Sequence, residues 1–358
     1  MTGPRLDREA LNCLLKGASV LGTGGGGSYS RGRAIVEEIV SEGRSVELID
    51  PDRLPPEALG ISTAMAGGGL THAEVERLEA LATEPPAVPA ARALAAYLGR
   101  PIGFVFPLEV GPQNTLEAIR LAAHLGVPVA DGDCAGRAVP ELDQTTLALF
   151  DIPLAPFVGA TFQGDLALFT RVADAARGEA LCRAMATCSG GLLCLTGFPA
   201  TGARMREALI PRTLSRCLEL GALLGPGRQP AEALAAKGGG RVAFQGRVTR
   251  TETRLEGGFF RGHLDLEGTG AFAGERYRVG IQNEFMWAWR NGALDIRCPD
   301  LICVVDSDSG LGKVTYGHGF ENALEGGEAL SVLHLPCAEV WDSPRGRGFF
   351  PAPPPAVA

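Results

Sequence analysis

The sequence lacks any apolar run close to the roughly 20 residues that a membrane-spanning helix needs. Its first nine residues also lack the apolar core of a signal peptide. Basic residues are outnumbered by acidic ones, 33 against 41, and the net charge of −8 argues against nucleic-acid binding, which needs a basic surface. We therefore expect a cytoplasmic protein that acts on a small molecule, without a membrane or nucleic-acid partner.

Disulfide and paired-histidine patterns are also missing. The nine cysteines are odd in number and scattered without paired spacing, which fits reduced thiols better than a disulfide framework. The five histidines form no paired ligand motif such as His-Glu-x-x-His. Any metal site would therefore be assembled from residues that lie far apart in the sequence.

The chain does have the composition and length of a two-domain globular protein. It has 358 residues, of which 46% are hydrophobic and 21% charged. Hydrophobic periodicity predicts helices and strands in alternation, with helices near 7–21, 31–42 and 116–125 and strands near 45–49, 59–66, 101–107 and 127–130. Such alternation is typical of βαβ units and predicts an α/β domain with a largely parallel sheet.

The pattern changes near residue 155. Helical segments at 175–188 and 204–224 precede strands at 241–251, 259–267, 275–281, 285–290, 301–305, 329–334 and 338–341. The Gly-rich turns between these strands favour a smaller β-rich domain, either a sandwich or a partial barrel. We place the α/β domain at 1–165, a helical linker and the β-rich domain at 166–350, and a frayed or extended Pro-rich tail at 351–358.

An acidic segment follows the expected strand 127–130. Residues 131–141 read Asp-Gly-Asp-Cys-Ala-Gly-Arg-Ala-Val-Pro-Glu. Open α/β sheets place their ligand sites just past the carboxyl ends of strands, so we predict catalytic roles for Asp131, Asp133, Arg137 and Glu141. The alternative is a structural loop in which Arg137 pairs with Asp133 or Glu141 and fixes a turn.

A glycine-rich loop is the second feature. Gly24, Gly25, Gly26 and Gly27 precede Ser28, where a helix is expected to begin. Glycine amides can turn toward one anion, and a helix N-terminus adds its dipole. The loop matches neither a phosphate-binding loop nor a dinucleotide fingerprint. We predict that these five residues bind an anionic part of the substrate, and the alternative is a tight structural turn.

Glu109 and Asn114 flank a Gly-Pro turn after the expected strand 101–107. Glu109 should therefore face the same crevice as Asp131 and Asp133. Poor solvation and neighbouring carboxylates would raise its pKa and suit it to general acid or base work, whereas the alternative is a solvated loop carboxylate. Asn114 either orients a ligand or caps the next helix, and for this residue alone we favour the cap.

Cys134 and His72 are the candidate metal ligands. Cys134 lies inside the acidic segment, and His72 opens a helix after a Gly-rich turn. A thiolate, a histidine and one or two carboxylates would form a zinc site. Without a metal, Cys134 should be chemically quiet, because nearby carboxylates disfavour a thiolate. His334 and Cys337 flank a Leu-Pro pair and form a weaker second pair.

Several segments together resemble the bacterial S-methyl thiohydantoin desulfurase family. They are residues 21–28, 109–114 and 131–141, with later landmarks at 210–215, 299–302 and 335–338. The resemblance covers nearly the whole chain and implies an α/β domain followed by a smaller β-rich one. Two positions differ from many relatives: Val110-Gly111-Pro112 replaces a Gly-Gly pair, and Cys134 replaces an apolar or small residue.

The resemblance implies a hydrolase that degrades thiohydantoins derived from sulfur-containing histidine betaines, with a link to hydantoinase-type proteins. For replacement of the S-methyl group by oxygen we assign Glu109 or Asp133 to proton transfer and Asp131 to orientation or metal binding. Arg137 would pair with a substrate carboxylate or with Glu141. The alternatives are an amide hydrolase acting on a hydantoin or another cyclic ureide, and a non-catalytic partner of a hydantoinase-like chain. We also expect a homo-oligomer.

Overall fold

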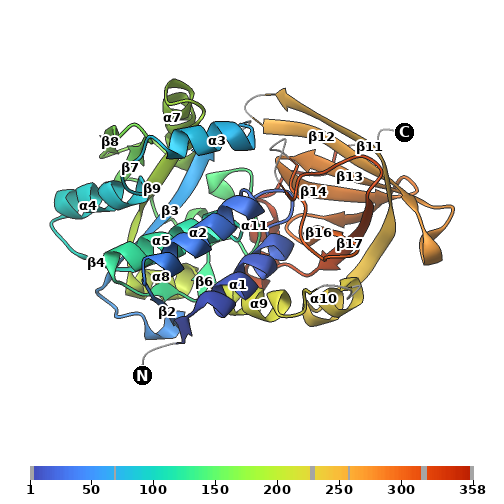
Figure 1. The fold of residues 1–358 in the computed structure, drawn as a ribbon, viewed down its shortest axis with the longest axis horizontal. Coiled ribbons are helices and arrows are strands. Elements are labelled where there is room, and N and C mark those ends of the chain that lie inside the picture. Colours follow the sequence, from blue (N-terminus) through green and yellow to red (C-terminus); the bar gives the residue numbers. More distant parts are fainter. Residues whose placement is uncertain (1–3, 68–69, 226–229, 257–258, 316–320, 355–358) are drawn as a thin grey trace.

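The protein has two domains that lie side by side (Figure 1). The computed structural model describes residues 4–67, 70–225, 230–256, 259–315 and 321–354. An α/β domain carries the first sheet, and a β-rich domain carries the second. The expected fold class is therefore confirmed.

The first sheet has eight strands in the order β1-β2-β5-β4-β3-β9-β7-β8. These are β1 (Arg5–Leu6), β2 (Val46–Ile49), β5 (Val129–Ala130), β4 (Ile102–Val105), β3 (Leu59–Gly67), β9 (Leu192–Thr201), β7 (Phe157–Ala160) and β8 (Leu166–Phe169). The run β2-β5-β4-β3 is parallel, and the remaining pairs are antiparallel. The carboxyl ends of the parallel strands therefore meet at one edge of the sheet.

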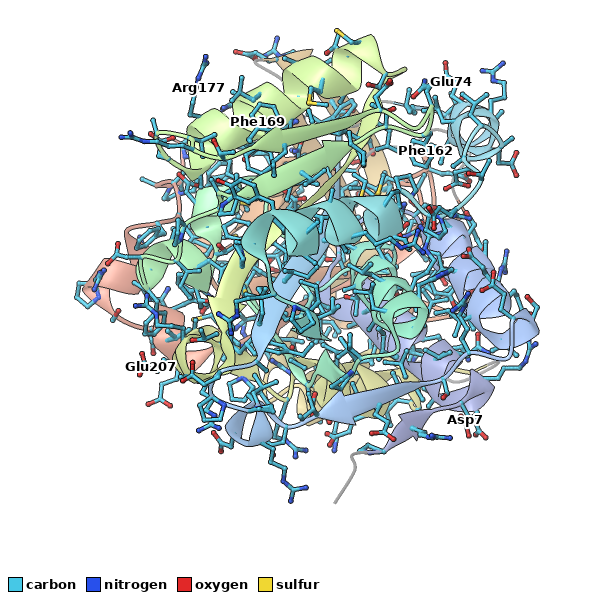
Figure 2. The ribbon with its side chains drawn as sticks, turned by 90° about the vertical axis from the view of Figure 1, so that its left-hand side faces the viewer. Asp7, Glu74, Phe162, Phe169, Arg177 and Glu207 are labelled. Atoms are coloured by element: carbon cyan, nitrogen blue, oxygen red, sulfur yellow. The ribbon has the colours of Figure 1, made fainter. Side chains whose placement is uncertain are left out.

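Both faces of the parallel part of this sheet are largely buried, so strands such as β3 are apolar runs rather than alternating ones. A hydrophobic cluster packs on each face, and neighbouring residues of a strand point to opposite faces. Val105 packs in one cluster and Phe104 in the other. Val129 and Ala130 alternate in the same way, although Ala130 ends its strand. On the second face, Phe169 of β8 stacks on Phe157 of β7 with 4.6 Å between ring centroids, beside α7 (Ala175–Cys188) (Figure 2).

The helices begin largely where the sequence carries capping residues. They are α1 (Arg8–Leu21), α2 (Tyr29–Ser41), α3 (His72–Glu79), α4 (Ala87–Leu98), α5 (Asn114–Leu125), α6 (Thr146–Leu149), α7 (Ala175–Cys188), α8 (Gly202–Ala208), α9 (Thr213–Gly221), α10 (Ala231–Lys237) and α11 (Pro344–Arg347). Asp7 and Ser28 accept from the first turns of α1 and α2, and Thr71 with Glu74 forms a capping box on α3. No helix among the described residues has the length and apolarity needed to cross a bilayer.

The second sheet is antiparallel, in the order β15-β14-β13-β12-β11-β17-β16. Its strands are β11 (Arg241–Glu256), β12 (Phe259–Gly268), β13 (Arg276–Gln282), β14 (Glu284–Arg290), β15 (Ala293–Arg297), β16 (Leu301–Asp306) and β17 (Ala329–Leu335). One face packs around Phe244, Tyr277 and Phe285. The long strands β11 and β12 curve over the domain toward the first one (Figure 1).

The first sheet extends past residue 165, where we expected the first domain to end, because β8 and β9 belong to that sheet and β9 lies between β3 and β7. Two details of the expected layout need correction. The helix expected at 204–224 is divided by β10 (Ile210–Pro211), which pairs with β6 (Gly132–Asp133). The segment expected as a strand at 338–341 forms a 3-10 turn instead, where the buried Trp341 donates its indole N–H to the carbonyl of Ala135.

The helices α1 and α9 touch through their backbones. A Cβ atom built on Gly17 would lie 1.8 Å from the carbonyl oxygen of Cys217, and one built on Gly221 would lie 1.7 Å from that of Cys13. Glycine is required at both positions because any side chain would push the helices apart. This contact holds α9 against the first domain.

We predict that Gly17→Ala destabilises the protein. In a helix interior, alanine normally stabilises the protein by about 0.5–1 kcal/mol relative to glycine. Overpacking against the Cys217 backbone should destabilise it by about 1–3 kcal/mol or more. Chemical denaturation measures the net loss. Gly326→Ala is the matched control, because a Cβ there meets no atom within 4 Å. A Gly17→Ala protein as stable as the control would contradict the proposed helix contact.

Candidate functional site

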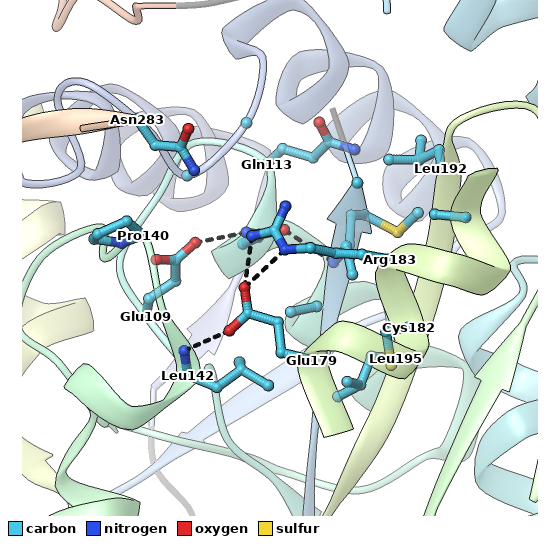
Figure 3. Close-up of a pocket in the computed structure, with 18 of the residues that line it drawn as sticks. Glu109, Gln113, Pro140, Leu142, Glu179, Cys182, Arg183, Leu192, Leu195 and Asn283 are labelled. Carbon is cyan, nitrogen blue, oxygen red and sulfur yellow. Dashed lines mark hydrogen bonds and ion pairs between the residues drawn. The ribbon is translucent and has the colours of Figure 1, made fainter. Parts of the chain in front are cut away.

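A cavity of about 330 Å³ lies between the two domains (Figure 3). Of the residues predicted from the sequence, the cavity is lined by Gly26, Gly27, Ser28, Glu109, Asn114 and Glu141. The second domain contributes Leu255, Phe260, Asn283 and Glu284. The site therefore depends on both domains.

Glu109 lies in the loop after β4, and only 7% of it is exposed. Its Oε2 accepts from the Val139 amide at 2.7 Å, and its Oε1 accepts from the Asn114 side chain at 2.6 Å. Burial raises the pKa of Glu109 to about 7, while these two hydrogen bonds oppose the shift. This carboxyl group can therefore exchange a proton near neutral pH, as a general base must.

Asn114 orients Glu109 and does not cap a helix. It is the first residue of α5, and the helix has no side-chain cap at its N-terminus. Its Oδ1 accepts from the Met65 amide at 3.2 Å while its Nδ2 donates to Glu109. The side-chain amide is thus fixed from both ends, and the preferred expectation of a cap is wrong.

Glu284 is the residue that the sequence analysis missed. It begins β14 after Asn283, whose φ is 57°, and only 4% of it is exposed. Its Oε2 has no hydrogen-bond partner among the described residues. Burial raises the pKa of Glu284 well above its usual value, and the charge of Glu109 adds to the shift. The sequence feature that could have identified Glu284 as a site residue is its position directly before the apolar run Phe285–Trp289.

More charged groups line the cavity beside these two. Arg183 of α7 donates to Oε1 of Glu179 at 3.0 Å, and the other oxygen of Glu179 accepts from the Leu142 amide at 3.0 Å (Figure 3). Glu141 accepts from Gln282 of the second domain at 3.0 Å. Burial raises the pKa of Glu141, and its carboxylate neighbours Asp143 and Glu179 add to the shift.

An apolar wall faces the acidic side. Leu192 and Leu195 of β9 line it from the first domain, and Leu255 and Phe260 line it from the β11–β12 pair. Beside them, the guanidinium of Arg183 lies 5.0 Å from the ring centroid of Phe259, a cation–π contact between the domains. The cavity thus offers an apolar surface next to proton-transfer groups.

Three of the predicted site residues in the acidic segment do not line the cavity: Asp131, Asp133 and Arg137. They stabilise the fold instead. Asp131 accepts from the Ser215 amide at 2.8 Å and thereby caps α9 from a distance. Asp133 is fully buried, and its Oδ2 accepts from the amides of Ala135 and Gly136. Burial raises the pKa of Asp133 to about 6. Proton transfer by Asp133 in this cavity is not supported by its position.

Arg137 joins the two domains. Its guanidinium donates to the carbonyl oxygens of Phe285 at 2.9 Å and Asp300 at 3.1 Å, both in the second domain. It pairs with neither Asp133 nor Glu141, so both the expected ion pair and the role in holding a substrate carboxylate need correction. The N–H groups of the guanidinium are used by carbonyl oxygens of the second domain, which are buried beside it and need a donor.

The glycines of residues 24–27 allow close packing. A Cβ on Gly25 would lie 2.0 Å from Oε1 of Glu284, and one on Gly26 would lie 2.3 Å from the Cα of Gly111. The amides of Gly24 and Gly25 donate to the backbone carbonyls of Lys313 and Gly22. These two amides are therefore not available to an anion.

The end of the loop is also engaged with the protein. A Cβ on Gly27 would lie 2.4 Å from the side chain of Gln113, whose Oε1 accepts from the Ser28 amide. The hydroxyl of Ser28 accepts from the Arg31 amide and caps α2. The structure thus favours the structural alternative for the loop over anion binding.

Cys134 does not fit a metal site in the cavity. Its side chain is fully buried and does not line the cavity, and burial raises its thiol pKa well above the usual value. His72 begins α3, but its side chain lies outside the described part of the structure. The described residues do place Glu38, Glu42 and His124 within metal-binding reach of one another, at the C-terminal end of α2 and on α5. Zinc binding stays a prediction.

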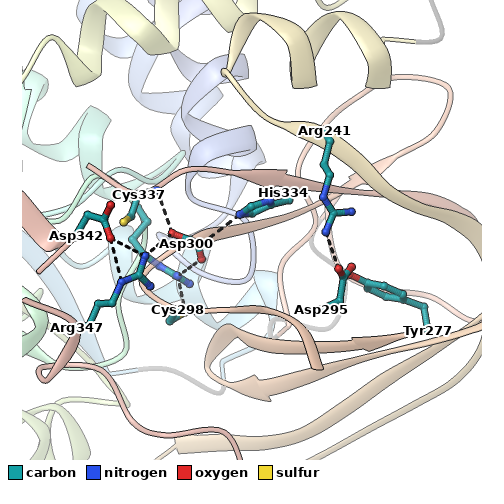
Figure 4. A network of polar contacts seen from close by, with 10 residues as sticks. Arg241, Tyr277, Asp295, Cys298, Asp300, His334, Cys337, Asp342 and Arg347 are labelled. Atoms are coloured by element: carbon teal, nitrogen blue, oxygen red, sulfur yellow. Dashed lines mark hydrogen bonds and ion pairs between the residues drawn. The ribbon is translucent and has the colours of Figure 1, made fainter. Parts of the chain in front are cut away.

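His334 and Cys337 meet through Asp300 (Figure 4). The Nε2 of His334 lies 3.3 Å from Oδ2 of Asp300, and the amide of Cys337 donates to Oδ1 at 3.4 Å. Arg347 reaches the same carboxylate at 3.5 Å. This network fastens the C-terminal segment to β16 and β17 and does not line the cavity between the domains.

Comparison with known proteins matches almost the whole chain. The model described as S-Me-THD-like, N-terminal domain, matches residues 9–171, and the model described as S-Me-THD-like, C-terminal domain, matches 173–350. The chain belongs to the S-Me-THD-like family. Membership confirms the resemblance found in the sequence.

A solved structure shares this fold. The crystal structure of a protein from Chromobacterium violaceum is 25% identical in sequence and superimposes with a TM-score of 0.80, covering 97% of this chain and 96% of the other. Among curated proteins, no match is found. The fold shared with that protein thus extends over both domains.

We predict that Cys134 is chemically quiet in the folded protein. Because its thiol is buried and its pKa is raised, iodoacetamide should modify it only after unfolding. Mass spectrometry of labelled peptides measures this, and the exposed Cys188 serves as the internal control that reacts in the native state. Labelling of native Cys134 as fast as Cys188 would contradict the assignment.

Proposed function

We propose that this protein is a hydrolase that replaces the S-methyl group of an S-methyl thiohydantoin by oxygen. The products are a hydantoin and methanethiol. The observation that carries the proposal is Glu109, a buried carboxyl group that lines the cavity and has a pKa of about 7. Family membership supports the choice of substrate.

The chemistry needs a base more than it needs an acid. The electrophilic carbon lies between two ring nitrogens and carries the methylthio group. Glu109 takes a proton from water while the water oxygen bonds to this carbon, which gives a tetrahedral intermediate. The carbon–sulfur bond then breaks, and the proton on Glu109 passes to the departing methanethiolate. Water is consumed, methanethiol leaves, and Glu109 returns to its ionised state.

The cavity suits such a ligand. Its volume of about 330 Å³ lies at the small end of ligand sites in proteins. The apolar wall of Leu192, Leu195 and Phe260 can pack against the ring and the methylthio group. Glu109 is held by the Val139 amide and the Asn114 side chain, so its carboxylate is oriented before a substrate arrives.

We predict that Glu109→Gln lowers kcat/KM for methanethiol release by at least roughly 100-fold, because glutamine cannot accept the proton. In the parent protein kcat/KM should rise with pH through about 7, as Glu109 ionises. A thiol-reactive dye measures release. Retained activity in the variant, or release of ammonia or an opened ring without thiol, would contradict the proposal.

The variant should also remain folded. The pKa of Glu109 is raised from 4.5 to about 7 in the folded protein, so its ionisation opposes folding as the pH rises through that window. Glu109→Gln removes this cost but turns an NH2 group toward the N–H of Val139 or Asn114, so we expect the variant to be folded above neutral pH with the two effects opposing each other. Glu267→Gln, on the exposed face of β12, is the control for activity and stability.

A further inference from the structure

The cavity between the domains has an unbalanced charge. Its described lining contains four carboxylate side chains and one guanidinium, and these are Glu109, Glu141, Glu179, Glu284 and Arg183. The guanidinium already binds Glu179 at 3.0 Å. The local field therefore favours a ligand with positive charge over one with negative charge.

Glu284 is the acceptor that this lining leaves unsatisfied. Both oxygens of Glu109 accept hydrogen bonds from the protein, whereas Oε2 of Glu284 has no partner among the described residues. Buried polar groups in proteins are nearly always paired. Because the Glu284 residue lines the ligand-sized cavity, an N–H group of the ligand can supply the missing partner when the carboxylate turns toward it.

Resting on the proposed function, we propose that the cavity recognises its substrate as an amidinium-like cation, with an N–H group that donates to Glu284. The substrate class is a protonated isothiourea, in which one carbon bears two nitrogens and a thioether sulfur. A positive charge shared over that carbon makes attack by water easier. Glu284 would thus hold the group whose carbon reacts, while Glu109 activates the water.

Charges around Glu284 give the sign of the pH dependence. Burial and the charge of Glu109 raise the pKa of Glu284, while Arg137 and Arg183 lower it. Glu141 and Glu179 line the same cavity and add negative charge. A cationic ligand binds the ionised carboxylates, so it should displace protons and bind more tightly as the pH rises. An anionic ligand should show the opposite trend.

Three probes of nearly equal shape test the charge. Benzamidine is a cation, benzamide is neutral and benzoate is an anion. Calorimetric titration of the full-length protein should give at least about 10-fold tighter binding for benzamidine than for the other two, increasing from about pH 6 to about pH 8. Equal affinities, tighter binding of benzoate, or no binding of any probe would overturn the proposal.

Variants assign the effect to Glu284. Glu284→Gln keeps the shape and removes the charge, so benzamidine binding should weaken by roughly 10-fold or more while benzamide binding is unchanged. Glu267→Gln, an exposed carboxylate of the same sheet, should leave benzamidine binding as in the parent. Unchanged benzamidine binding by a folded Glu284→Gln protein would overturn the assignment. If that variant does not fold, the three-probe series on the parent protein remains decisive.

Methanethiol release separates this inference from the proposed function. Tight benzamidine binding without thiol release from S-methyl thiohydantoins would refute the desulfurase activity and leave the charge preference intact. Thiol release by a protein that does not prefer benzamidine would support the activity and refute the amidinium recognition.

Discussion

The burial of two carboxyl groups in one cavity is the constraint on which the site depends. Glu109 belongs to the first domain and Glu284 to the second; burial raises the pKa of both, and the charge of Glu109 further disfavours ionisation of Glu284. This arrangement exists only while the domains are packed together. The close approach of Glu284 to the loop also explains why residue 25 is glycine, since a Cβ there would lie 2.0 Å from the carboxylate.

The acidic segment after β5 stabilises this arrangement, although most of its residues do not line the cavity. Asp131 caps α9, Asp133 holds the turn at Ala135 and Gly136, and Arg137 reaches into the second domain. Because the guanidinium binds carbonyls of Phe285 and Asp300, it fixes β14 against the first domain. The position of Glu284, next to Phe285, follows from that contact. Residues that resemble a catalytic cluster in the sequence thus fix the geometry between the domains.

Local patterns made part of this predictable. Periodicity located α1 and α5, the Gly-rich turn before His72 located the start of α3, and the position of Glu109 after a strand placed it in the cavity. What the sequence does not show is which distant segments meet. The insertion of β9 between β3 and β7, the carbonyl partners of Arg137 and the location of Glu284 all depend on long-range packing.

Direct titration of the glutamate side chains tests the central claim. In protein labelled with carbon-13 at the glutamate carboxyl group, nuclear magnetic resonance should show two carboxyl resonances that titrate near pH 7, those of Glu79 and Glu109, and only the second should be missing from Glu109→Gln. Another should remain protonated to higher pH and be missing from Glu284→Gln. Titration of every glutamate close to the ordinary value of about 4.3 would contradict the account of two buried carboxyl groups.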